Sequence, residues 1–190
     1  MAHAWLMLAL CLALALAVRA QFSFGAESAG PADPAGSGTA ARAAYLYNFL
    51  GYVEWPSRAF TIASEPFVIG VMNADPVGAE LLLSTLGREV NNRPVTIRLL
   101  KEGDSLQGLH LLYVGPTDAS QLEQVLRQVP ERWTVTVTEN DNGLLLGSAI
   151  NFRDIGGRLR FEVSMPAANR GDFRLSSRML SVAIVQQGTN

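Results

Sequence analysis

"PFVIGVM", residues 66–72, is the stretch that decides the fold. It is a continuous apolar run of strand length, whereas a strand with one face in water alternates apolar and polar residues. We therefore expect a strand that is buried on both faces. Asp75-Pro76 follows and indicates a helix start, with Asp75 as the capping side chain and proline at the first helical position. This succession of strand and helix is typical of an α/β domain.

Three further segments continue the alternation toward the C-terminus. "RPVTIRLL" (93–100) alternates and predicts a half-covered strand, whereas "LHLLYVG" (109–115) is a second continuous apolar strand. A helix over 118–128 opens with a capping-box pattern, and "WTVTVTE" (133–139) is the next strand. We expect a single α/β domain with a mainly parallel sheet, flanked by helices and joined by right-handed crossovers.

"AAYLYNFLGYVEWP" (43–56) is expected to be a helix that Pro56 ends. It is too apolar around its circumference for an ordinary surface helix. It therefore predicts a helix that covers the apolar sheet, with Tyr45, Phe49 and Tyr52 buried.

The C-terminal part changes character. Segments 148–153 and 158–164 flank "DIGG" (154–157), which predicts an antiparallel hairpin with one wet face. In "LSSRMLSVAIVQ" (175–186) the apolar residues have helical spacing, and we favour a helix there. Its inner part, "LSVAIV", also fits a strand.

The N-terminal part carries an export signal. The apolar run Trp5–Val18 is shorter than a membrane-spanning helix needs, and a cleavage site after Ala20 is consistent with a secretory signal peptide. An uncleaved anchor is the alternative. A stretch rich in Gly, Ala, Pro and Ser follows it. We divide the chain into a signal peptide (1–20), a flexible leader (21–41), the folded domain (42–186) and a tail (187–190).

Composition excludes several kinds of chemistry. The net charge of −2 lacks the excess of positive charge that is typical of nucleic-acid-binding proteins. Cys11, the single cysteine, lies in the signal peptide, so the exported chain has neither disulfides nor thiol redox control. His110 lies in an apolar strand and is expected to be structural. "ENDNG" (139–143) lacks the terminal ligands of a calcium loop and is interpreted as a turn. We predict no catalytic residue, metal or cofactor, and no enzymatic activity.

One edge of the predicted sheet is a candidate ligand crevice. Asn73, Asp75, Gly115 and Thr117, with Glu139, fall at or just after the carboxyl ends of predicted strands. Open α/β sheets bind ligands at that edge. The alternative interpretation, which we favour, is that these are capping and turn residues.

The order of these segments resembles the YfiR-like family of exported bacterial proteins. The likeness rests on "YVEWP", "PFVIGVM" followed by "DP", "VNNRPVTIRLL", "LHLLYVG" and "GSAINFRDIGGRLRFEVSMPAANRGDFRLSSRMLSVA", and covers about residues 42–186. It implies a periplasmic, non-enzymatic α/β protein that often dimerises. The best-known member represses YfiN, a membrane-bound diguanylate cyclase, through its periplasmic sensor domain, and so lowers cyclic di-GMP and biofilm formation.

The resemblance predicts a periplasmic homodimer that represses such a cyclase or regulates another inner-membrane sensor. That member carries disulfides tied to redox control, which this chain lacks after its signal peptide. The alternative function is a small-ligand-binding domain that feeds another membrane sensor, such as a histidine kinase. A repressor needs an apolar contact patch with a polar rim. The residues that we expect to contact the partner are Trp55, Phe60, Phe173 and Met179.

Overall fold

The computed structural model describes residues 34–62 and 64–186. The predicted signal peptide, the leader up to residue 33 and the tail lie outside the described residues. Helices are α2 (Pro34–Tyr52), η1 (Ser57–Ala59, a 3₁₀ turn), α3 (Asp75–Ser84), α4 (Ala119–Gln128), α5 (Met165–Arg170) and α6 (Ser177–Leu180). Strands are β1 (Val53–Glu54), β2 (Phe67–Met72), β3 (Glu89–Val90), β4 (Arg93–Leu100), β5 (Leu111–Val114), β6 (Val135–Thr138), β7 (Ile150–Ile155), β8 (Arg158–Ser164), β9 (Arg174–Leu175) and β10 (Ile184–Gln186).

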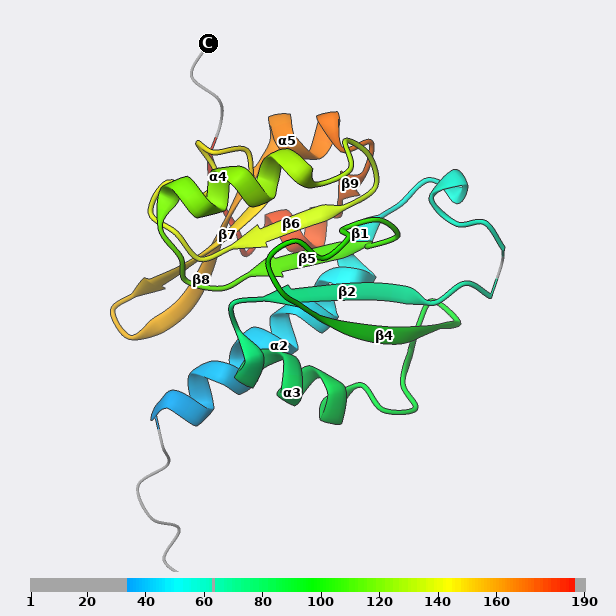
Figure 1. The fold of residues 1–190 in the computed structure, drawn as a ribbon, viewed down its shortest axis with the longest axis horizontal. Helices are drawn as coiled ribbons and strands as arrows, with labels where there is room; N and C mark the ends of the chain where they lie inside the picture. Colours follow the sequence, from blue (N-terminus) through cyan, green and yellow to red (C-terminus); the bar gives the residue numbers. More distant parts are fainter. Residues whose placement is uncertain (1–33, 63, 187–190) are drawn as a thin grey trace, which may run out of the picture. The chain divides into compact units, whose positions relative to one another are not determined.

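The main sheet has the strand order β10-β8-β7-β6-β5-β2-β4-β3 (Figure 1). Its centre, from β4 to β7, is parallel, and β7 with β8 forms the expected antiparallel hairpin. β1 and β9 pair separately as a small antiparallel ribbon. The predicted fold class, a single α/β domain with a mainly parallel sheet and a C-terminal hairpin, is confirmed.

The two faces of the sheet carry separate apolar cores. In β5, Leu111 and Tyr113 belong to the larger core, whereas Leu112 and Val114 belong to the smaller one, which α4 covers. Both sets are fully buried. The continuous apolar run of β5 thus follows from its being covered on two sides, as the absence of alternation predicted.

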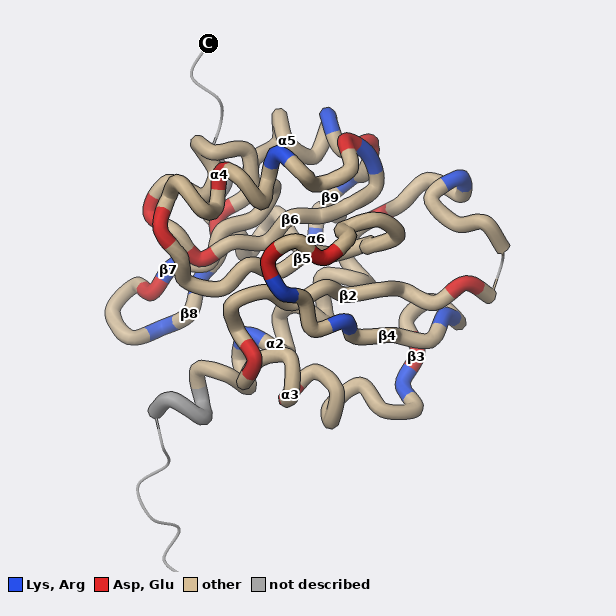
Figure 2. The backbone as a smooth tube through the Cα atoms, in the orientation of Figure 1, with Lys and Arg blue, Asp and Glu red and all other residues tan. Residues whose placement is uncertain are grey.

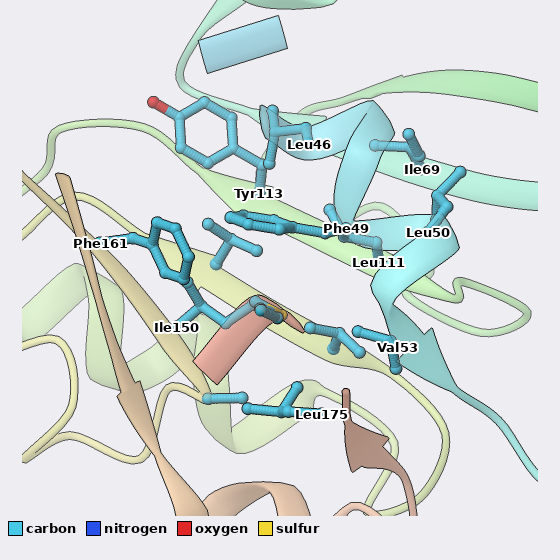
Figure 3. Close-up of a cluster of buried hydrophobic side chains, with 14 of the residues drawn as sticks. Leu46, Phe49, Leu50, Val53, Ile69, Leu111, Tyr113, Ile150, Phe161 and Leu175 are labelled. Carbon is cyan, nitrogen blue, oxygen red and sulfur yellow. The ribbon is translucent and has the colours of Figure 1, made fainter. Parts of the chain in front are cut away.

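Helix α2 crosses the larger core, and Figure 3 shows its side chains against those of the strands. Leu46, Phe49 and Leu50 are fully buried, and the Phe49 ring lies 5.1 Å from that of Phe161. Tyr45 and Tyr52 are only half-buried. The expectation of burial therefore holds in full for Phe49 and in part for the two tyrosines. The helix therefore buries one side and exposes the other along its length.

The start of α2 differs from the expectation. It begins at Pro34, so residues 34–41, which we assigned to the flexible leader, are helical. Proline is well suited to a first helical turn, and the alanines before Tyr45 favour helix. Arg42 also binds Glu139, the residue that follows β6, and this contact holds the first turns of the helix against the domain.

Two helix starts were predicted from capping residues. Asp118 caps α4 as expected, because its side chain accepts a hydrogen bond from the Gln121 N–H at 2.9 Å. The start of α3 at Asp75 is also confirmed, but its capping position is Ala74, and no side chain caps it. The Asp75 carboxylate instead lies in the first turn, where the helix dipole favours negative charge.

The prediction of a helix over 175–186 is wrong. Only Ser177–Leu180 are helical, and Ile184–Gln186 form β10, which runs parallel to β8. The reason is tertiary: β8 pairs with β7 on one side only, and its other edge needs hydrogen-bond partners. The strand interpretation of "LSVAIV" holds for its last two residues.

Candidate functional site

The end of α2 carries a tryptophan into a corner between the sheet and the β1–β9 ribbon. After Tyr52 the chain becomes β1, which pairs Val53 with Leu175. Pro56 is the N-cap of the η1 turn, and as the residue before a proline Trp55 is disfavoured in helix. Trp55 is thereby fixed at the point where the chain leaves the core, half-buried between the two sheets.

Trp55 is held by one hydrogen bond and by ring contacts. Its indole N–H donates to the carbonyl oxygen of Trp133 at 2.8 Å, and its ring lies 5.1 Å from that of Phe67. A buried indole generally needs such an acceptor. We call this region the tryptophan corner, consisting of Trp55, Arg58, Phe60, His110, Trp133 and Asp172.

Trp133 and Asp172 have unusual backbone conformations. Their φ angles are +66° and +57°, in the left-handed region that costs energy for residues other than glycine. The Trp133 indole donates to the Asp172 carboxylate at 3.0 Å, and Arg58 donates to the same oxygen at 2.7 Å. The hydrogen bond from Arg58, followed by that from Trp133, lowers the pKa of Asp172 below its usual range. Asp172 therefore stays ionised and ties three chain segments together.

His110 forms the floor of the corner. Its Nδ1 accepts a hydrogen bond from the Val68 N–H at 3.2 Å, and its ring stacks on Phe60 with centroids 4.7 Å apart. Burial lowers the pKa of His110, so the ring is neutral at pH 7. Arg93 covers the Phe60 ring at 3.7 Å in a cation–π contact. The expectation of a structural histidine is confirmed.

Two open hollows flank the corner. One of about 380 Å³ lies beside Trp55, Arg58 and Asp172. The other, of about 460 Å³, lies beside His110 and Trp133. Both are lined by aromatic rings together with charged groups, which is the composition of protein-binding hot spots.

The structure brings together three of the four residues expected to contact a partner. Trp55 and Phe60 both pack on Phe67, and Phe173 lines the same hollow as Trp55. Met179 lines neither of the two hollows and, like Phe173, belongs to the larger core. Phe173 and Met179 are buried. Trp55 and Phe60 are therefore the two of the four whose side chains are partly exposed and could contact a partner.

The candidate ligand crevice is packed rather than open at its centre. A Cβ on Gly115 would lie 2.5 Å from the Asn73 carbonyl oxygen, so backbone already fills the space between these two strand ends. Thr117 hydrogen-bonds to Gln121 within its own turn, and Asp75 begins α3. An open groove of about 580 Å³ lies elsewhere, lined in part by residues of α4 and α5. A ligand role for these four residues remains a prediction.

A charged network that we did not predict lies at that same edge. Arg42 binds the Glu139 carboxylate through two nitrogens, one at 2.7 Å, and the Tyr113 hydroxyl donates to it at 2.9 Å. Burial acts to raise the pKa of Glu139, but the hydrogen bonds from Arg42 and Tyr113 hold it below the usual value. Burial raises the pKa of Tyr113. Glu139 is thus an ionised anchor for α2 whose two oxygens accept three hydrogen bonds.

Arg58, Trp133 and Asp172 were also missed from the sequence. Trp133 lies 39 positions before Asp172 and Arg58 lies 114 positions before it, and no periodicity links the three residues. Only the Trp-Pro pair at the end of α2 marked this region.

Metal ligands and membrane spans were also sought in the described part of the chain. No three His, Cys, Asp or Glu side chains gather there in a way that could hold a metal ion. Within residues 34–62 and 64–186, no helix has the length and apolar character to cross a bilayer.

The chain was compared with known protein families. Residues 39–184 match the family described as DUF4154, YfiR/HmsC-like. The match begins within α2 and ends at the first residue of β10, and so spans nearly all of the described domain. No curated protein matches the chain.

Proposed function

The chain belongs to the YfiR/HmsC-like family, and on this premise we propose that it is a periplasmic regulatory protein. It binds and represses the periplasmic sensor domain of an inner-membrane diguanylate cyclase of the YfiN kind, and so lowers cyclic di-GMP and biofilm formation. The observation that carries the proposal is the family match over residues 39–184, nearly all of the described domain. Cleavage after Ala20 delivers the protein to the periplasm, where it acts by contact and not by catalysis.

The tryptophan corner is the contact surface that best fits this role. Trp55 and Phe60 are half-buried and keep part of their apolar surface in solvent, and Ile62 beside them is exposed. Arg58, whose side chain is 62% exposed, stands at the rim. Aromatic anchors with a neighbouring arginine are typical of binding hot spots. The hydrogen bonds of Trp133 and Asp172 hold these side chains in place before a partner arrives.

The experiment is a capture of the full-length protein with the diguanylate cyclases of the same cell. Detergent-solubilised membranes are passed over the immobilised protein, and cyclic di-GMP is measured in cells with and without its gene. We expect one cyclase to be retained and the second messenger to rise on deletion. Failure to retain a cyclase together with an unchanged cyclic di-GMP level would refute the proposal.

A matched pair of charge reversals tests the surface. Arg58 and Arg127 have the same side-chain exposure, 62%, and each forms one ion pair, but Arg127 lies on α4. Arg58→Glu should weaken capture of the cyclase, because it places a carboxylate beside Asp172 and disrupts the rim. Arg127→Glu should bind as the unchanged protein does. If both variants bind alike, the partner uses another surface.

A second function rests on the hollows beside Trp55 and His110. A small amphipathic ligand held there would make the protein a ligand-binding domain that feeds another membrane sensor, such as a histidine kinase. A thermal-shift screen with periplasmic metabolites tests it, since a ligand that binds only the folded state raises Tm. A hit that Arg58→Glu abolishes would support this alternative.

A further inference from the structure

The outer edge of β4 leaves backbone hydrogen-bonding groups without a strand partner. β4 is next to the last strand, and β3 covers only its first two residues. In β2, the carbonyls of Val68 and Met72 accept bonds from the β5 side, so the even-numbered residues of β2 face β5 and the odd-numbered ones face β4. With the parallel register given by Phe67 opposite Val95, the odd-numbered residues of β4 point their N–H and C=O outward.

Exposed leucines border this edge. On α3, Leu82, Leu83 and Leu86 are 45%, 78% and 85% exposed, and on β4 Leu99 is 48% exposed. A hollow of about 430 Å³ lies between Leu82 and Leu86 on one side and residues 94–97 on the other. Figure 2 shows no charged residue over the last turn of α3, residues 81–84. Apolar surface beside an open strand edge is typical of an interaction site.

We propose that the β4 edge and the α3 leucines form an interface with a second copy of this chain, in which two β4 strands pair antiparallel about a two-fold axis at Ile97. The free segment of the edge is Val95–Leu99. With the axis at Ile97, Val95 of one copy lies opposite Leu99 of the other, and Ile97 lies opposite itself. The outward-pointing residues are therefore the ones that exchange hydrogen bonds.

Side chains and chain ends both fit this register. Val95, Ile97 and Leu99 point to the same face as α3, because Leu99 is the side chain that a Cβ on Gly78 would meet. The pairing therefore places an apolar stripe against its own copy, and the two sets of α3 leucines flank it. An isologous interface must be self-complementary in this way.

The ends of the paired segment also favour a second copy over the strand of another protein. The chain leaves β4 at Lys101, where a turn closes by a 3.1 Å bond from Asp104. In this register Leu100 lies opposite Pro94 of the other copy, and there β3 begins to fill the edge with Glu89. The two-fold pairing therefore stops where the edge stops, and it brings Lys101 of one copy toward Glu89 of the other.

The first experiment measures the oligomeric state of the full chain by sedimentation equilibrium. We expect a dimer that Leu86→Glu weakens by about tenfold or more, because a carboxylate would be buried in an apolar interface. Leu145→Glu is the matched control, since Leu145 is 84% exposed and lies in the loop before β7. It should leave the dimer unchanged. Both substitutions replace exposed side chains, so neither threatens the fold.

The second experiment tests the register in a Cys11→Ser background. Residues 96 and 98 of opposite copies form a non-hydrogen-bonded pair, with Cα atoms about 4.5 Å apart, within disulfide range. A mixture of Thr96→Cys and Arg98→Cys chains should form a disulfide-linked dimer in excess of either variant alone. A monomer at every concentration, a dimer that Leu86→Glu leaves intact, or no excess of cross-link in the mixture would each overturn the proposal.

Discussion

Replacing Tyr113 by phenylalanine tests how α2 is anchored to the sheet. The Tyr113 hydroxyl is buried and donates to the ionised Glu139 carboxylate, which Arg42 also binds. A hydrogen bond to a charged group contributes about 1.5–3 kcal/mol. We therefore expect Tyr113→Phe to lower the free energy of unfolding by about that amount, measured by urea denaturation with linear extrapolation at a fixed protein concentration.

The same substitution should cost almost nothing once Glu139 is replaced by methionine. The hydroxyl then has no carboxylate to bind, so removing it removes an unpaired buried group. The difference between the two costs is the coupling energy, expected at about 1.5–3 kcal/mol. Tyr47→Phe is the control, because its hydroxyl makes an exposed 3.2 Å bond to the Glu89 carbonyl. A cost of Tyr113→Phe that agrees in both backgrounds within about 0.5 kcal/mol would refute the anchoring role.

Three further predictions concern pH, backbone contact and packing. Because the pKa of Glu139 is lowered on folding, its contribution is fully present above the unfolded-state pKa, about 4.3, and is lost as pH falls through the folded value. The stability gap to Glu139→Gln in urea titrations should therefore close in acid. Gly115→Ala should destabilise by about 1–3 kcal/mol, since its Cβ meets the Asn73 carbonyl, whereas Gly51→Ala on α2 should stabilise by about 0.5–1 kcal/mol, and a reversed order in thermal melts would contradict this. Phe49→Ala should cost about 3–5 kcal/mol by urea denaturation, and a loss under 1 kcal/mol would show that Phe49 is not packed as described.

Local patterns were enough to predict the framework of the sheet. Residues 93–100 alternate, and they form β4 over the same range. Asp118 caps α4 because a capping interaction spans only three positions, and such short signals are visible in a sequence. The continuous apolar runs at 66–72 and 109–115 predicted burial on two faces, which the two cores of β5 confirm.

What the sequence did not reveal depends on distant partners. Ile184–Gln186 became a strand because β8 offered an edge, and nothing in "LSVAIV" encodes that edge. The tryptophan corner likewise depends on an Arg58–Asp172 ion pair between residues 114 positions apart. The corner could be suspected from Trp55-Pro56, but its hydrogen-bonded frame could not.

The placement of α2 sets the order in which the molecule can fold. This helix comes first among the described elements, yet its anchor Glu139 lies 97 positions later and Leu175 and Met179 complete its core. A chain that emerges N-terminus first therefore presents the apolar side of α2 before the surface that covers it has been delivered. Contacts so distant in sequence slow folding and leave an aggregation-prone intermediate with exposed apolar surface. We expect the nascent protein to need a holding chaperone until its final third has crossed the membrane.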